Sequence, residues 1–272
     1  MNSIEHYKEL ISSLGEFPKE GTFESQTKFN ENNDFFYNEI YLKKRREAGY
    51  PEIAEKLSSL QQKFPNITDT CSKCVDFFYT HRQDRTFTKQ LDIERAFFFE
   101  IGFLKYLKSK GFNAERADEE KVGHHKGYPD LQVYDKKGKI SCYLEMKYNA
   151  APFVMVKNFV SGRECYEGSL TLNPPKLKRQ VAMIGKEIKE PIFYVYWADF
   201  PCMKGIFYTD IMNIWSYFLD MGGKKQHDRK VGQGDFRYGR KIGQSDIIYP
   251  PIFEMGNFEE LIQELTEVTN NF

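Results

Sequence analysis

The feature that most restricts the fold of this 272-residue chain is a pair of strand-like runs separated by a very short turn. The first run covers residues 127–134 and the second covers residues 140–148, and the Asp-Lys-Lys-Gly sequence between them has the composition of a turn. Strands joined so closely pair as an antiparallel hairpin. With the turn centred on residues 136 and 137, the numbers of paired residues sum to about 273–275, which places Asp130 opposite residues 143–145.

Alternation along the second strand gathers polar side chains on one face. Glu145 and Lys147 point to that face, while Cys142, Leu144 and Met146 point to the other. Because the hairpin register brings an aspartate to the same end, two acids and a lysine are expected to converge there. Two carboxylates in one small site repel each other, so both stay ionised only when a cation joins them.

The expected ligand of such a site is a hard cation. Oxygen ligands without a nearby His or Cys pair favour Mg²⁺. A bound Mg²⁺ polarises a phosphoryl oxygen and lowers the pKa of a water molecule that attacks phosphorus. An adjacent lysine orients that water and stabilises the developing negative charge. The pattern therefore indicates metal-assisted hydrolysis of a phosphodiester bond.

The same residues carry a resemblance to a known family. Pro129-Asp130, fourteen further residues and then Glu145-Met146-Lys147 resemble the signature of the PD-(D/E)XK nuclease superfamily. That superfamily includes restriction endonucleases, Holliday-junction resolvases and several repair and phage nucleases. The resemblance implies that Asp130 and Glu145 bind the metal and that Lys147 is the catalytic lysine. Rival acid-x-Lys triplets occur, but only this one lies in a strand-like run with the required alternation.

A helix is predicted over residues 91–110, with Gly111 as its C-cap. Glu100 falls inside its apolar stripe, where an ionised carboxylate is costly unless it is paired or bound to a cation. The alternative is a helix edge at which this side chain reaches water or an arginine. Members of the resembled family often carry a glutamate on this helix, which makes Glu100 the preferred third metal ligand and Glu94 the runner-up. The stripe consists of Ile93, Phe97, Leu104 and Leu107.

The remaining core elements follow in the order of the resembled family. A strand is predicted over residues 113–116, and a buried strand over residues 192–197. Between them, a helix begins at Pro174 or Pro175 with Asn173 as its cap. The fold class is therefore α/β (α+β mixed), with a restriction-endonuclease-like αβββαβ core and a mixed central sheet flanked by helices. The apolar stripe of the later helix consists of Leu177, Val181, Ile184 and Ile188. Gln180 is expected to be a polar flank of this helix, and the alternative is a glutamine beside the site, which some members of the resembled family carry at this place.

Two regions flank this core. Residues 1–85 are predicted to be mainly helical and to pack on a nuclease core of residues 86–272, which gives one compact domain. Cys71 and Cys74 form a CxxC motif without a second pair, so buried thiols are expected there rather than a zinc site. The N-terminal helices are expected over residues 4–14, 35–46 and 53–64.

Local charge, rather than total charge, points to a nucleic-acid partner. The 39 Lys+Arg and 39 Asp+Glu residues exclude a protein that coats DNA indiscriminately. Residues 222–244 carry seven basic and two acidic side chains, which favours a flexible basic loop that contacts phosphate, with a solvated loop as the alternative. A strand over residues 246–249 and a helix from Asn257, with Glu260 completing a capping box, close the chain. The predicted DNA contacts are His124, His125, Lys126, Tyr148, Asn149, Lys157, Asn158, Arg163, Arg229, Lys230, Arg237, Arg240 and Lys241.

These patterns favour a Mg²⁺-dependent, sequence-specific endonuclease for double-stranded DNA, most like a type II restriction enzyme. The resemblance implies a homodimer that cuts both strands and a companion DNA methyltransferase encoded nearby. The alternatives are a Holliday-junction resolvase, a repair or phage nuclease, and a non-cleaving DNA-binding protein on this fold. An odd number of cysteines, five, and the lack of a signal-peptide pattern or a long apolar run predict a cytoplasmic protein without a membrane span.

Overall fold

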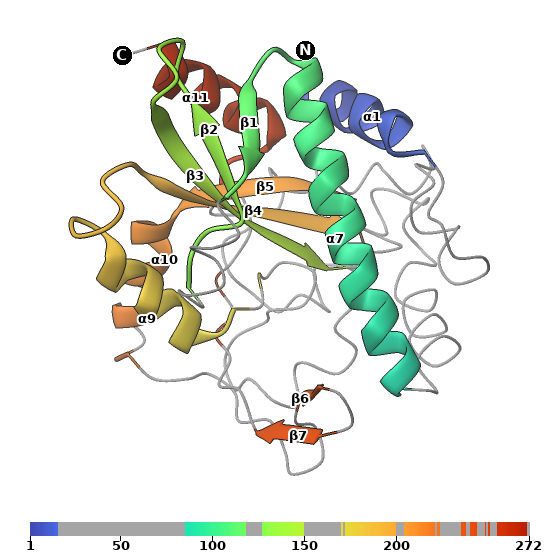
Figure 1. The fold of residues 1–272 in the computed structure, drawn as a ribbon, viewed down its shortest axis with the longest axis vertical. Helices are drawn as coiled ribbons and strands as arrows, with labels where there is room; N and C mark the ends of the chain where they lie inside the picture. The colour runs from blue at the N-terminus through green and yellow to red at the C-terminus, as the bar shows by residue number, and fades with distance from the viewer. Residues whose placement is uncertain are drawn as a thin grey trace, which may run out of the picture.

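The computed structural model describes residues 1–15, 85–117, 127–149, 170, 172–199, 204–220, 222–223, 235–237, 240–243, 248, 250 and 255–270. Within these residues the chain forms a mixed α/β fold around one five-stranded sheet (Figure 1). The strand order follows the sequence, and the strands are β1 (Asn113–Arg116), β2 (Leu131–Tyr134), β3 (Ile140–Asn149), β4 (Ile192–Asp199) and β5 (Lys204–Asp210).

One pairing in this sheet is parallel and the others are antiparallel. β3 and β4 run in parallel, while β1–β2, β2–β3 and β4–β5 are antiparallel pairs. A parallel pair needs a crossover connection, and here the connection contains helix α9 (Pro174–Met183). The predicted αβββαβ order and the mixed central sheet flanked by helices are thereby confirmed.

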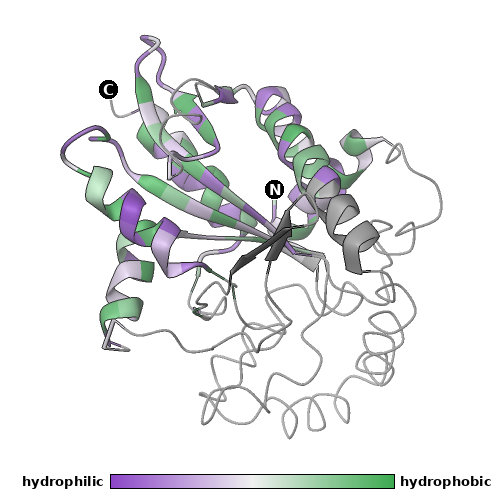
Figure 2. Cartoon of the chain, turned by 60° about the horizontal axis from the view of Figure 1, so that its bottom comes forward, coloured by the Kyte–Doolittle hydropathy of each residue, from purple (hydrophilic) through white to green (hydrophobic). Residues whose placement is uncertain are grey.

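An aromatic core holds three helices against one face of the sheet. These helices are α1 (Ser3–Leu14), α7 (Arg85–Ser109) and α11 (Phe258–Asn270). Trp197 of β4 is fully buried at the centre, and its indole Nε1 donates a hydrogen bond of 3.2 Å to the Tyr7 hydroxyl. Rings of Phe99, Phe103 and Tyr148 pack against the same indole. Hydrophobic and hydrophilic residues are mixed along the helices, as expected for elements that bury one side (Figure 2).

The other side of the sheet is covered by α9 and α10 (Ile211–Asp220), which contact each other. Asn173 caps α9 as predicted, and its side-chain Oδ1 accepts a hydrogen bond of 3.3 Å from the backbone amide of Lys176. The helix ends at Met183 rather than continuing to residue 188. The reason is Gly185, whose φ of 78° turns the chain back, so that Ile188 is buried after the helix and not on it.

The predicted helix around Glu100 exists, but it starts earlier, and its buried stripe includes the predicted Leu104 and Leu107 but not Phe97. α7 begins at Arg85, and Gly111 ends it with a φ of 87°, as predicted. Phe97 is 49% exposed and lies under the Arg116 guanidinium, so its assignment to the buried stripe is wrong. Three consecutive phenylalanines left the register of the stripe ambiguous. Among the α7 side chains that the structure describes, the buried hydrophobic ones are Phe99, Phe103, Leu104, Tyr106 and Leu107.

The C-terminal region contains elements that the sequence pattern did not predict. β5 and α10 follow β4, and a two-stranded hairpin of β6 (Asp235–Arg237) and β7 (Arg240–Gly243) occupies part of the predicted basic loop. In the predicted strand over residues 246–249, Ile248 forms an isolated bridge with Leu172. The final helix begins after Asn257 with the predicted capping box, whose two hydrogen bonds measure 2.7 and 3.0 Å.

At the N-terminus, α1 confirms the predicted helix over residues 4–14. The helices expected over residues 35–46 and 53–64 lie outside the described residues, as does the CxxC motif. The division into residues 1–85 and 86–272 stays a prediction. Among the described helices, none is long and apolar enough to cross a membrane.

The α1–α7 contact generates a test of stability against pH. His6 is buried, its Nδ1 lies 2.5 Å from the Tyr106 hydroxyl oxygen, and burial followed by the nearby Lys110 charge lowers its pKa below 6.5. As pH falls below that value the unfolded chain takes up a proton that the folded chain resists, so stability decreases. We expect the melting temperature to fall more between pH 7.5 and 5.5 in the wild type than in His6→Gln. Each kcal/mol of unfolding free energy that the wild type loses should lower its melting temperature by roughly 2–4 °C. Equal falls would contradict the prediction.

Candidate active site

The hairpin of β2 and β3 places Asp130 as the sequence predicted. Leu131 pairs with Leu144, and the Asp130 backbone amide donates a hydrogen bond of 3.0 Å to the Leu144 carbonyl. The Asp130 side chain also joins the strand, because its Oδ2 accepts a hydrogen bond of 2.8 Å from the Met146 amide. One carboxylate oxygen is thus fixed by the backbone of β3, while the other, Oδ1, faces the first turn of α9.

Glu145 is the centre of the site and has no exposed surface. Its Oε1 accepts hydrogen bonds from the ammonium groups of Lys147 and Lys176, the latter at 2.5 Å. Its Oε2 accepts a hydrogen bond of 2.8 Å from the Gln180 amide, and the Tyr194 hydroxyl donates to the amide oxygen of Gln180. Both carboxylate oxygens are therefore satisfied by side chains from β3 and α9.

The two carboxylates titrate in opposite directions. Burial, and then the charge of Glu145, raises the pKa of Asp130 to about 6. Burial alone would also raise the pKa of Glu145, but the ammonium groups of Lys147 and Lys176 hold it below the ordinary value. Burial would lower the pKa of Lys176, and the charges of the two acids raise it instead. The site thus keeps Glu145 ionised and leaves Asp130 short of positive charge.

Glu100 lies at the margin of this group. Its Oε1 accepts a hydrogen bond of 2.9 Å from Arg116 Nε, which matches the predicted alternative of a helix residue paired with an arginine. Its charge contributes to the raised pKa of Asp130, so the two carboxylates lie within electrostatic range. In the part of the chain that the structure describes, no three His, Cys, Asp or Glu side chains form a metal-binding group. The roles of Glu100 and Glu94 as a third ligand stay predictions.

The donor set nevertheless fits a hard divalent cation. Asp130 and Glu145 present carboxylate oxygens to one space, and Lys176 Nζ lies there, 3.8 Å from Asp130 Oδ1 and 2.5 Å from Glu145 Oε1. An ammonium group held between two acids marks a point at which positive charge is favoured. Oxygen ligands of this kind suit Mg²⁺ better than zinc or copper.

Three residues of the site were missed or misjudged from the sequence. Gln180 is fully buried and bonded to Glu145, so its assignment as a polar flank of α9 is wrong. Lys176 lies four residues earlier, on the same face of the helix, and this spacing was the available signal. Tyr194 lies on β4 opposite Glu145, and it gave no signal before the parallel pairing was known.

The predicted DNA contacts are only partly described. Tyr148 stacks on Phe99 with 4.2 Å between ring centroids, which gives it a packing role, and Asn149 ends β3. Gly127, just before Tyr128, lies against α9, where an added Cβ would meet the Arg179 side chain at 2.9 Å. Arg237, Arg240 and Lys241 belong to β6 and β7. His124, His125, Lys126, Lys157, Asn158, Arg163, Arg229 and Lys230 lie outside the described residues.

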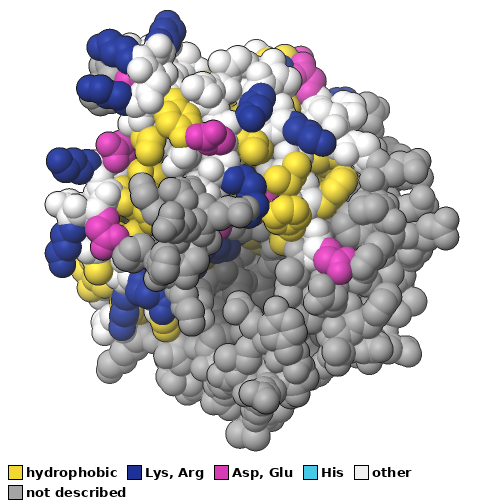
Figure 3. All heavy atoms as spheres, in the orientation of Figure 1, with side chains coloured by type: hydrophobic (Ala, Val, Ile, Leu, Met, Phe, Trp, Pro, Cys, Tyr) yellow, Lys and Arg dark blue, Asp and Glu magenta, His cyan; other side chains and the backbone are white. Residues whose placement is uncertain are grey.

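The described surface shows no single basic patch in the view of Figure 3, where lysine and arginine side chains are spread among acidic ones.

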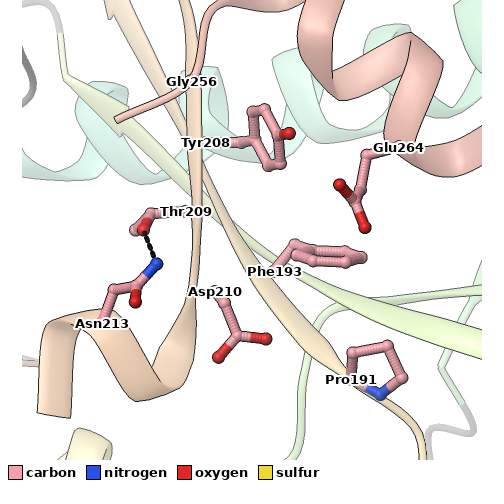
Figure 4. A pocket seen from close by; sticks show the side chains of 8 residues that line it. All are labelled: Pro191, Phe193, Tyr208, Thr209, Asp210, Asn213, Gly256 and Glu264. Atoms are coloured by element: carbon pink, nitrogen blue, oxygen red, sulfur yellow. Dashed lines mark hydrogen bonds between the residues drawn. The ribbon is translucent and has the colours of Figure 1, made fainter. Parts of the chain in front are cut away.

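A pocket of about 320 Å³, separate from the candidate active site, lies by the edge strand β5, between α10 and α11 (Figure 4). Phe193 lines it from the face opposite Tyr194, whereas Thr209, which pairs with Tyr194, lines it from the other face, so the pocket lies at the edge of the sheet. The pocket is lined by Pro191, Phe193, Tyr208, Thr209, Asp210, Asn213, Gly256 and Glu264.

Comparison with known proteins finds little similarity. No protein-family model matches the chain, and no curated protein matches its sequence. Among solved structures, the chain is similar to D212, a nuclease from a fusselovirus, with 12% sequence identity and a TM-score of 0.32. The similarity covers 61% of this chain and 84% of D212.

The raised pKa of Asp130 predicts that its carboxylate destabilises the metal-free fold. The unfolded side chain loses its proton near 3.8 and the folded one near 6, so stability falls as pH rises through this interval. In EDTA at pH 7 we expect Asp130→Asn to be more stable than the wild type by about 1–3 kcal/mol, and the difference to shrink toward pH 4.

Urea titration of both proteins measures this difference. Asp220→Asn, which removes an exposed carboxylate from α10, is the matched control and should leave stability unchanged. A less stable Asp130→Asn protein would show that the aspartate strengthens the metal-free fold.

Proposed function

We propose that this chain is a Mg²⁺-dependent endonuclease that hydrolyses phosphodiester bonds in double-stranded DNA. The observation that carries the proposal is Glu145, a fully buried carboxylate kept ionised beside Asp130 and Lys147 at one end of a hairpin. Together with the acid-x-Lys pattern, this arrangement supports phosphodiester hydrolysis over a binding role alone.

The side chains around the site have separable tasks. Asp130 and Glu145 would hold Mg²⁺, which supplies polarisation of a phosphoryl oxygen and a lowered pKa for a bound water. The Met146 amide orients Asp130, and Gln180 orients Glu145. Lys147 Nζ is held by Glu145 and, at 3.1 Å, by the Met146 carbonyl. Held in this way, its ammonium group would stabilise negative charge that develops on the phosphate.

The finer parts of the proposal concern the substrate and the assembly. Sequence-specific cutting like that of a type II restriction enzyme would require two sites acting on the two strands, so we propose a homodimer. A companion methyltransferase encoded nearby would protect the host DNA. The basic side chains predicted for residues 224–241, together with Arg163 and Asn158, are proposed to contact the duplex.

Cleavage of plasmid DNA tests the proposed activity. We expect discrete fragments with Mg²⁺ and none with EDTA. Lys147→Ala should slow cleavage by about 10²–10³-fold because charge stabilisation at the phosphate is lost. Asp130→Ala and Glu145→Gln should abolish cleavage but retain DNA binding in a gel-shift assay.

The matched control is Lys136→Ala, since Lys136 is exposed in the turn at the opposite end of the same hairpin. This variant should cut like the wild type. Cutting restricted to branched junctions would replace the restriction proposal with a resolvase. Binding without any Mg²⁺-dependent cleavage in the wild type would leave only a DNA-binding protein.

A further inference from the structure

Lys176 occupies the position between the two acids of the site. Its ammonium nitrogen lies 2.5 Å from Glu145 Oε1 and 3.8 Å from Asp130 Oδ1, and 27% of its side chain is exposed. Glu145 therefore has two ammonium partners on the same oxygen. Lys147 contacts Glu145 from the same strand, whereas Lys176 comes from α9 and reaches both Glu145 and Asp130.

The position of Lys176 on α9 runs against the local chemistry of helices. It is the third residue after the Asn173 cap, in the first turn, where the helix dipole favours negative charge. Two other helices of this chain also have asparagine caps, at Asn2 and Asn257. Their third residues are glutamates that complete capping boxes by bonding back to the cap. In α9 the corresponding place holds a lysine.

This departure has one evident compensation. A lysine at this place cannot accept the hydrogen bond from the backbone amide of the cap residue, and its charge interacts unfavourably with the helix dipole. The compensating interaction is its contact with Asp130 and Glu145. Asn173 still accepts the backbone amide of Lys176, and Pro174 and Pro175 fix φ in the first turn, so the start of the helix is held in place. Residues that break a local rule without a gain in packing are expected at functional positions.

We propose that Lys176 is a built-in counter-ion that bridges Asp130 and Glu145 when no divalent cation is bound and that the cation must displace. The inference rests on the proposed metal site of Asp130 and Glu145. In the metal-free protein the ammonium group limits the repulsion between the two acids. When the cation binds, the partly exposed side chain swings toward solvent, so part of the binding free energy is used to break its ion pairs. Lys176 thereby weakens metal affinity and stabilises the metal-free fold.

Binding of Mn²⁺ to the full chain without DNA tests this inference, with free Mn²⁺ followed by electron paramagnetic resonance. Lys176→Met should bind Mn²⁺ roughly tenfold more tightly than the wild type, which corresponds to the loss of one competing charge-assisted contact. Lys176→Arg, which keeps the charge, should bind like the wild type. In EDTA, Lys176→Met should melt at a lower temperature.

Lys178→Met is the matched control, because Lys178 is on the same helix, is exposed and lies over the Phe218 ring instead of the acids. It should leave Mn²⁺ affinity unchanged. The counter-ion role would be overturned if Lys176→Met bound Mn²⁺ no more tightly than the wild type. It would also be overturned if Lys176→Met and Lys178→Met gained the same affinity. If Lys176→Met does not fold, Lys176→Gln takes its place with the same expected result.

The same experiment separates this inference from the proposed function. Glu145→Gln should lose the Mn²⁺ site, which assigns the measured binding to these acids. Wild-type binding that depends on Glu145 but is unchanged in Lys176→Met contradicts the counter-ion and leaves the nuclease proposal standing. No Mn²⁺ binding in any variant overturns both.

Discussion

A charged carboxylate without exposed surface is the constraint on which the rest of the site depends. Leaving Glu145 ionised and unpaired in the protein interior would cost several kcal/mol. The fold meets this cost with two ammonium groups and an amide, and the amide is in turn held by Tyr194. These partners come from three parts of the core: Lys147 from β3, Lys176 and Gln180 from α9, and Tyr194 from β4. The hairpin, the crossover helix and β4 must therefore all form before Glu145 is satisfied.

The sheet separates this polar network from the packing that stabilises the molecule. Trp197 and its aromatic neighbours fill one face, under α1, α7 and α11. Glu145 and Tyr194 project from the other face toward α9. Strand alternation is sufficient to produce this division, because consecutive residues of β3 and β4 serve opposite faces. A polar site can therefore lie one residue along the strand from the apolar core.

The sequence predicted contacts between residues that are close along the chain better than contacts between residues that are far apart. The register that joins Asp130 to β3 follows from a short turn and was predicted correctly. The contacts of Lys176 and Gln180 with Glu145 depend on where α9 packs on the sheet. The hydrophobic pattern of the helix does not determine that position. The predicted burial of Phe97 was wrong for another reason, since a run of three phenylalanines is compatible with more than one buried stripe. The roles of Asp130, Glu145 and Lys147 in catalysis remain predictions.

The connection between β3 and α9 has a consequence for how such a protein can change over evolution. It leaves the sheet at Asn149, two residues after Lys147, and the chain is again part of the core at Leu170, six residues before Lys176. Segments inserted between these points would begin and end beside the same two acids without interrupting any strand or helix of the core. Lengthening a loop costs little stability. New surface contacts can therefore be acquired at this place in the fold while the strands and helices that hold Asp130 and Glu145 stay unchanged.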